Sequence, residues 1–204
     1  MRPDAVMRLA PVIPVLVIEN VREARPIAEA LVAGGLPALE VTLRTPRALD
    51  VIAEMAAVKG ATVGAGTVID EAQLDAAIGA GARFIVSPGL TEPLARAAIA
   101  RAIPFLPGVA TAADIMRGLD LGLDHFKFFP AEAVGGIRAL AALSAPFRQC
   151  RFCPTGGITA ATAPDWLALD TVLCVGGTWL VPAEGRDAGG VRARARAAAA
   201  LTRG

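Results

Sequence analysis

The stretch TVGAGTVIDEAQLDAAIGAGARFIVSP, residues 62–88, contains the pattern that decides the fold. It begins with a short run of small and β-branched residues, continues with a helix-like segment, and ends with a second apolar run. The glycines before the second run lie where the helix would end, and glycine is the usual residue just after a helix. This order predicts two parallel strands joined by a helix.

The same unit recurs along the whole chain, with strand-like runs about every 20 to 25 residues. The expected strands are 11–18, 38–43, 62–68, 83–88, 103–109, 125–130, 151–157 and 171–177. The expected helices between them include 21–35, 45–60, 71–81, 91–101, 111–122 and 135–145. Eight units predict an α/β fold of the closed (β/α)8 or TIM-barrel type, forming one compact domain over residues 1–204. An open, doubly wound sheet is the alternative.

Composition and charge exclude several classes of partner. Of the 204 residues, 54% are hydrophobic and 19% are charged, which is unlike a disordered chain. The net charge of +1 provides no field that would attract nucleic acid or an anionic membrane surface. Apolar runs are interrupted well before the roughly 20 residues that span a membrane, so we expect a soluble protein. The tail 191–204 is expected to be a solvated helix, with a basic nucleic-acid arm as the lesser alternative.

The cysteines and the N-terminus predict a cytoplasmic location. Cys150, Cys153 and Cys174 form no disulfide framework, and such sparse cysteines are typical of a reducing compartment. Cys150 and Cys153 make one C-x-x-C without a second pair, so we interpret them as structural residues and not as metal ligands. The first 20 residues lack the apolar core and cleavage site of a signal peptide.

The second expected strand carries charged residues on one face. Side chains alternate across a strand, so the helix-facing side has Leu39, Val41 and Leu43. The interior side has Glu40, Thr42 and Arg44. In a barrel the active site lies at the carboxyl ends of the strands, where an acid and a base are costly unless paired or used. A Glu40–Arg44 ion pair that serves stability alone is the alternative.

The sixth expected strand contains a lysine between two phenylalanines. Its helix-facing side has Phe126 and Phe128, and its interior side has His125, Lys127 and Phe129. Burial disfavours the charged form of an amine, and a neutral amine attacks carbonyl carbons. A Lys127–Glu40 salt bridge without chemistry is the alternative. His125 begins its strand, far from the carboxyl end, and the only histidine cannot build a multi-histidine metal site.

Glycine-rich segments follow three strands: GAGT at 64–67, PTGGIT at 154–159 and VGGTWLVP at 175–182. Glycines after the last two strands of a barrel are typical of a phosphate site, because backbone N–H groups can approach the anion there. Tight turns without a ligand are the alternative. No Walker motif and no G-x-G-x-x-G is present, so no nucleotide cofactor is expected.

Together these residues suit a Schiff-base lyase that acts on a phosphorylated keto acid. The amine would condense with a ketone, the carboxylate would move protons, and the Arg44 guanidinium would hold a substrate carboxylate. Hydroxyls would come from Thr67, Thr155 and Thr178. The alternatives are a phosphate-binding isomerase or epimerase, a metal-dependent pyruvate aldolase, and a binding protein that keeps the fold without the reaction.

The chain also closely resembles the 2-keto-3-deoxy-6-phosphogluconate aldolases, the class I enzymes that also cleave 4-hydroxy-2-oxoglutarate. The resemblance runs from PVIPVLVI to GGTWLVP, and the matching segments are VAGGLPALEVTLRT, VGAGTV, SPGLTEP, FKFFPAE, RFCPTGGI and VGGTWLVP. It implies cleavage to pyruvate and glyceraldehyde 3-phosphate in the Entner-Doudoroff pathway. A 2-dehydro-3-deoxy-6-phosphogalactonate aldolase is the alternative substrate assignment. The resemblance further implies a homotrimer of (β/α)8 barrels without metal or organic cofactor.

The resemblance assigns roles to individual residues. Lys127 falls on the Schiff-base lysine and Glu40 on the general acid/base. Residues that fall on the contacts to the pyruvyl unit are Arg44, Thr67, Pro88 and Phe129. Residues that fall on the distal, phosphate end are Thr155, Gly156, Gly157 and the segment 176–178, which includes Gly177 and Thr178. Related sequences commonly have Ser where this chain has Thr178; threonine keeps the hydroxyl, so phosphate binding is expected to survive.

Overall fold

Strands and helices alternate along the computed structural model, which describes residues 2–183 and 186–202. The strands are β1 (Val12–Leu16), β2 (Ala38–Thr42), β3 (Thr62–Gly66), β4 (Ile85–Val86), β5 (Phe105–Leu106), β6 (Gly108–Val109), β7 (His125–Phe128), β8 (Arg151–Pro154) and β9 (Val175–Gly177). The helices are α1 (Pro3–Met7), α2 (Val21–Ala33), α3 (Ala48–Ala56), α4 (Glu71–Gly79), α5 (Glu92–Ala100), α6 (Ala112–Asp120), α7 (Gly136–Ser144), α8 (Ala163–Leu167) and α9 (Ala188–Ala199). Each of the eight expected strand regions contains a strand. The fifth contains two, β5 and β6, separated by Pro107, which has no N–H to donate to a ladder.

Side-chain caps explain where several helices begin. The Asp70 carboxylate accepts a hydrogen bond from the Gln73 N–H at the start of α4. At the start of α6, Thr111 and Asp114 form a reciprocal capping box. Such caps satisfy the first N–H groups of a helix, which have no partner within it. The caps thus fix the points at which loops from the strands enter the helices.

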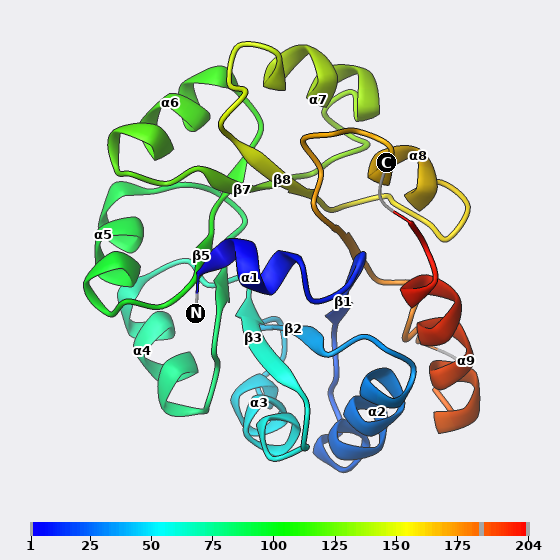
Figure 1. The fold of residues 1–204 in the computed structure, drawn as a ribbon. Helices are drawn as coiled ribbons and strands as arrows, with labels where there is room; N and C mark the ends of the chain where they lie inside the picture. The colour runs from blue at the N-terminus through cyan, green and yellow to red at the C-terminus, as the bar shows by residue number, and fades with distance from the viewer. Residues whose placement is uncertain (1, 184–185, 203–204) are drawn as a thin grey trace.

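All paired strands are parallel, which confirms the prediction of repeated βα units. One sheet has the order β5-β4-β3-β2-β1-β9, and a second has the order β6-β7-β8. Isolated parallel bridges join Phe152 to Val172 and Thr155 to Gly176, so residues of β8 and β9 also meet. Helices α2 to α9 lie around the strands (Figure 1).

The buried apolar residues form two clusters, one on each face of the strands. The larger cluster fills the layer between strands and helices and includes Leu39, Val41, Phe126 and Phe128. The smaller cluster lies between the inner faces of the strands and contains Val6, Met7, Ile13, Ala38, Phe84, Val86, Leu106, Cys153, Leu173 and Cys174. This division confirms the alternation expected for the second and sixth strands.

The short helix α1 closes the amino-terminal end of the interior. It lies across the middle of the view, in front of the strands (Figure 1), and its Val6 and Met7 side chains belong to the inner cluster. His125, the first residue of β7, lies with its Nε2 3.6 Å from Asp4 Oδ1 of this helix. His125 is therefore at the end of the strand away from the carboxyl ends, as expected.

Three helical features differ from the sequence-based expectations. Helices α1 and α8 were not predicted, because five residues are too few to show a helical period. Helix α9 is not wholly solvated: Val191, Ala195 and Ala198 are buried, and the helix packs against α2.

Among the described residues, no helix is long and apolar enough to cross a membrane.

Candidate active site

A buried ion pair links strands β7 and β2, which belong to different sheets. Lys127 Nζ of β7 is 3.1 Å from Glu40 Oε1 of β2, and donates a hydrogen bond to it. The side chains are 7% and 4% exposed, respectively. A buried charge pair is retained only when the partners compensate each other, so either residue alone would be strongly unfavourable here. Glu40 thus pairs with Lys127, and not with Arg44 as in one alternative.

The surroundings hold both side chains in fixed positions. Gly66, the last residue of β3, packs so closely under Glu40 that a Cβ at this position would overlap the carboxylate. The ring of Phe129 lies beside the amine, with Lys127 Nζ 5.1 Å from the ring centroid, which is within the range of a cation–π contact. The amine and the carboxylate therefore have little freedom to move apart.

A cavity of about 300 Å³ is lined in part by Lys127, the basic member of this pair. Its lining comes from the ends of β1, β2, β7, β8 and β9 and consists of Val15, Arg44, Lys127, Phe129, Thr155, Gly156, Gly157, Ile158, Gly176 and Thr178. Two of these, Val15 and Ile158, were not anticipated. Val15 could have been found, because it follows the buried Ile13 by two positions on the same face of β1. No pattern in the sequence marks Ile158.

Arg44 is exposed at the edge of this cavity, just beyond the end of β2. Two hydroxyl groups fix the backbone that carries it. Thr42 Oγ1 donates to the carbonyl of Leu16 at 3.0 Å, and Thr45 Oγ1 donates to the carbonyl of Ile18 at 3.1 Å. The guanidinium makes no ion pair within residues 2–183 and 186–202. It is thus available to an anionic ligand.

Glycines after β8 and β9 form one part of the cavity lining, which we call the glycine wall: Gly156, Gly157 and Gly176. Gly156 and Gly157 have φ values of +106° and +81°, which residues with a Cβ rarely adopt. Gly176 lies against the Thr155 side chain, and a Cβ there would overlap the Thr155 hydroxyl. The backbone is thereby exposed along this wall, as an anion-binding loop requires.

Three further expected site residues lie near the cavity without lining it. Thr67 directly follows Gly66 and has φ +63°. The Pro88 carbonyl packs against Gly108, whose strand partner is Lys127. Gly177 packs against the ring of Trp179. None of these three residues contributes to the lining of the cavity.

The three cysteines are free thiols, and all three are buried. Burial, assisted by the Asp124 carboxylate, raises the pKa of the Cys150 thiol to about 11. A thiol with this pKa is protonated and unreactive at neutral pH. The described residues contain no cluster of three or more His, Cys, Asp or Glu side chains with the spacing of a metal site.

A protein-family model described as "Aldolase: KDPG and KHG aldolase" matches residues 4–193. The chain belongs to the KDPG and KHG aldolase family. KDPG denotes the 2-keto-3-deoxy-6-phosphogluconate named by the resemblance above, and KHG the 4-hydroxy-2-oxoglutarate. The family membership predicted from the sequence motifs is therefore confirmed.

Several named aldolases are similar to this chain in sequence or in structure. It is 60% identical over 200 residues to the 2-dehydro-3-deoxy-phosphogluconate aldolase of Zymomonas mobilis, covering 98% of this chain and 96% of that protein. It is 54% identical over 187 residues to the KHG/KDPG aldolase of Escherichia coli, covering 91% and 88%. Among solved structures, the KDPG aldolase of Legionella pneumophila, with pyruvate captured as a covalent carbinolamine, has a TM-score of 0.93 at 45% identity, covering 99% and 98%.

Proposed function

We propose that this chain is a class I aldolase that cleaves 2-dehydro-3-deoxy-6-phosphogluconate to pyruvate and glyceraldehyde 3-phosphate through a Schiff base on Lys127. The observation that carries the proposal is that Lys127, which is buried and paired with Glu40, lines a cavity that the glycine backbone after β8 and β9 also lines. Family membership supports the reaction class. The KHG/KDPG name of the Escherichia coli relative supports a second activity on 4-hydroxy-2-oxoglutarate.

The reaction begins with transfer of a proton from Lys127 to Glu40, which leaves a neutral amine. The amine attacks the C2 ketone and forms a neutral carbinolamine. Glu40 gives its proton to the departing hydroxyl group, and loss of water leaves a protonated imine and the Glu40 carboxylate. Removal of the C4 hydroxyl proton, with Glu40 as the base, breaks the C3–C4 bond. The electron pair of that bond moves into the imine, which gives an enamine of pyruvate and releases the aldehyde. Glu40 returns a proton to C3, and hydrolysis frees pyruvate and Lys127.

The rest of the cavity binds the two ends of the substrate. Arg44 pairs with the C1 carboxylate, and Phe129 supplies an apolar wall beside the pyruvyl carbons. Thr67 and Pro88 complete this end. The phosphate at the other end meets the glycine wall, where the residues are Thr155, Gly156, Gly157, Gly177 and Thr178. The catalytic step requires no metal or organic cofactor in this proposal, because the imine itself accepts the electron pair.

We further propose that the two sheets join into one closed (β/α)8 barrel and that residues 1–204 form a single domain. The pairing of β9 with β1 and the bridges between β8 and β9 support closure. The strands also follow one another in sequence order, without the reversal that an open doubly wound sheet contains. We propose a cytoplasmic homotrimer, for which sedimentation should give three times the chain mass of 20.8 kDa.

Borohydride trapping tests the proposed nucleophile. The chain has two lysines, Lys59 and Lys127, so mapping an adduct reduces to a choice between two peptides. Reduction in the presence of pyruvate should attach a pyruvyl group to Lys127 alone. The Lys127→Ala variant should lose both the adduct and pyruvate release, whereas Lys59→Ala, a change at an exposed turn, should retain both. Cleavage by Lys127→Ala at the wild-type rate would refute the mechanism.

The substrate assignment is tested by measuring pyruvate release from each candidate substrate. The phosphogluconate-derived substrate should have the highest kcat/KM, and its phosphogalactonate epimer and 4-hydroxy-2-oxoglutarate should have lower values. Each assay is repeated with a chelator, which should leave the rate unchanged. A rate that collapses with the chelator would favour the metal-dependent alternatives.

A further inference from the structure

Glu132 follows β7 and takes no part in the proposed chemistry, yet its carboxylate has a fixed partner. Trp166 Nε1 of α8 donates a hydrogen bond to Glu132 Oε1 at 3.0 Å. Trp166 is fully buried (0% exposed), whereas Glu132 as a whole is exposed. A buried indole N–H needs an acceptor, and within the described residues this carboxylate is the one that the indole reaches.

The backbone and stem of Glu132 lie against the glycine wall of the cavity. The Glu132 N–H donates to the carbonyl of Gly156 at 3.1 Å, and the neighbouring Ala131 N–H donates to the carbonyl of Thr155 at 2.8 Å. The side-chain stem covers Gly157: a Cβ on that glycine would come within 2.6 Å of Glu132 Cγ. Glu132 thus contacts both Gly156 and Gly157, the two glycines of the wall that have positive φ values.

The same anchor also reaches the strand that carries the nucleophile. The Trp166 ring packs on Phe128 with the ring centroids 6.2 Å apart, and Phe128 directly follows Lys127. Glu132 itself is absent from the cavity lining. Its negative charge is therefore held at the indole and away from the place where a phosphate would bind, which avoids repulsion between the two anions.

We propose that Glu132 and Trp166 form a positioning pair that holds Gly156 and Gly157 in their anion-binding conformation and so sets the affinity for the phosphate end of the substrate. This inference rests on the proposed function. Neither residue touches the reacting atoms. Loss of the pair therefore weakens binding of the phosphorylated substrate and leaves Schiff-base formation with pyruvate, which has no phosphate end, unchanged.

The experiment compares four variants with the wild type: Glu132→Ala, Glu132→Gln, Trp166→Phe and, as a control, Glu92→Ala, which removes a surface carboxylate paired with Arg96. Two quantities are measured for each variant. The first is KM and kcat for cleavage of 2-dehydro-3-deoxy-6-phosphogluconate. The second is the pyruvate concentration that gives half-maximal borohydride trapping on Lys127.

Glu132→Ala should raise KM roughly tenfold, with kcat changed by less than about threefold, because a displaced anion-binding loop costs substrate positioning. Trp166→Phe keeps an aromatic ring but loses the indole N–H, so KM should also rise. Glu132→Gln keeps the stem and an oxygen acceptor, so its KM should stay within about twofold of the wild type. The pyruvate trapping constant should be unchanged throughout, and Glu92→Ala should match the wild type.

An unchanged KM in Glu132→Ala overturns the inference, as does a pyruvate trapping constant that rises as much as KM. If Glu132→Gln behaves like Glu132→Ala, the charge of Glu132 and not its hydrogen bond is responsible, and the positioning role is refuted. If Glu132→Ala does not fold, Trp166→Phe decides by the same two measurements. A wild type that neither cleaves the substrate nor traps pyruvate refutes the proposed function instead, so the two failures are distinguishable.

Discussion

Lys127 and Glu40 each depend on the other for their place in the interior. Each charge is nearly fully buried, and removing one partner would leave the other without compensation at a cost of about 3–5 kcal/mol. Gly66 beneath the carboxylate and Phe129 beside the amine limit the positions that both groups can take. The same geometry that makes the pair tolerable also places the proposed base, Glu40, within hydrogen-bond distance of the proposed nucleophile, Lys127.

Glu40→Gln should separate these two roles. Glutamine nearly preserves the shape and can still accept a hydrogen bond from Lys127, but it cannot take up and return a proton at neutral pH. We expect kcat for aldol cleavage to fall about 10²- to 10⁴-fold. Borohydride should still trap pyruvate on Lys127. A kcat near the wild-type value would mean that Glu40 serves only as a counter-ion.

Gly66→Ala should reduce activity more than stability. The new methyl would overlap the Glu40 carboxylate, so the carboxylate must move away from Lys127. We expect kcat to fall at least about tenfold, since small displacements of a catalytic group are costly. Gly64→Ala is the matched control: it lies two positions earlier on the same face of β3, where its methyl would meet the Phe84 ring.

The Gly64 variant should lower the free energy of unfolding by about 1–3 kcal/mol, as overpacking usually does, and should leave kcat unchanged. Urea denaturation and the cleavage assay provide both quantities for each variant. Equal effects of the two variants on kcat would contradict the placement of Glu40 over Gly66.

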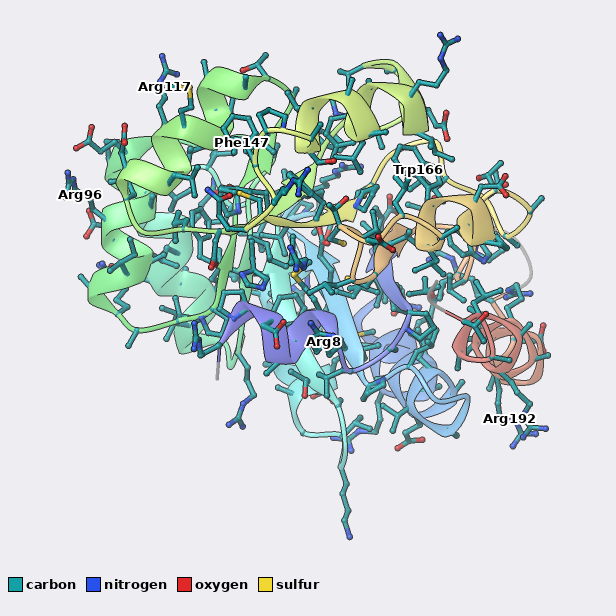
Figure 2. The ribbon with its side chains drawn as sticks, turned by 45° about the horizontal axis from the view of Figure 1, so that its top comes forward. Arg8, Arg96, Arg117, Phe147, Trp166 and Arg192 are labelled. Atoms are coloured by element: carbon teal, nitrogen blue, oxygen red, sulfur yellow. The ribbon has the colours of Figure 1, made fainter. Side chains whose placement is uncertain are left out.

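At the scale of elements, the interior has an apolar half and a polar half. Helix α1 and the inner cluster fill the amino-terminal half, and the ion pair and cavity occupy the carboxyl-terminal half. The helices around the strands present basic side chains outward, as Arg96, Arg117 and Arg192 do on α5, α6 and α9 (Figure 2). Stability and chemistry therefore rest on different sets of residues.

Met7→Ala tests this separation. Met7 is fully buried in the inner cluster, so its truncation should lower the free energy of unfolding by about 2–5 kcal/mol. Because the cavity lies at the other end of the strands, kcat and KM of the folded variant should equal those of the wild type. Leu9→Ala, at a position just after α1 that is 38% exposed, is the control and should cost under about 1 kcal/mol. A Met7→Ala variant with normal stability would show that α1 does not seal the interior.

The sequence was most informative where a pattern repeats. Alternation within the second and sixth strands placed Glu40 and Lys127 on the inner face, opposite Leu39 and Phe126. Patterning could not show which partner Glu40 takes, because Arg44 and Lys127 are both basic, and only the fold brings β2 and β7 together. It also could not find α1, whose burial depends on contacts with residues far along the chain. Nor could the sequence predict that the Trp166 indole donates to Glu132, because the two residues are 34 positions apart.

In the whole molecule, the last strand and helix pack against elements from the first part of the chain. Strand β9 pairs with β1, and α9 packs against α2. Arg186 adds a polar link, since its guanidinium donates to Glu23 Oε2 at 3.2 Å and to the carbonyl of Val17 at 3.4 Å. Contacts between residues so far apart in sequence make the last units dependent on the first, and cooperative unfolding follows from such dependence.

The proposed single domain should therefore unfold in one transition. Tryptophan fluorescence reports only on Trp166 and Trp179, near the end of the chain, whereas circular dichroism at 222 nm reports on helices throughout. At one fixed protein concentration, the two signals should give coincident urea curves. Tryptophan fluorescence that changes at a lower urea concentration than the helix signal would show that the carboxyl-terminal units unfold separately, and would contradict a single domain.

The glycine wall has a consequence for the reverse reaction, in which pyruvate is joined to an aldehyde. The proposed nucleophile, Lys127, comes from β7 and its proposed base, Glu40, comes from β2, whereas the glycine wall comes from the segments after β8 and β9. A protein engineer could therefore vary 155–158 and 176–178 to admit other acceptor aldehydes while the enamine-forming residues stay as they are. The choice of the donor, pyruvate, and the choice of the acceptor aldehyde would then depend on separate sets of residues and could be altered independently.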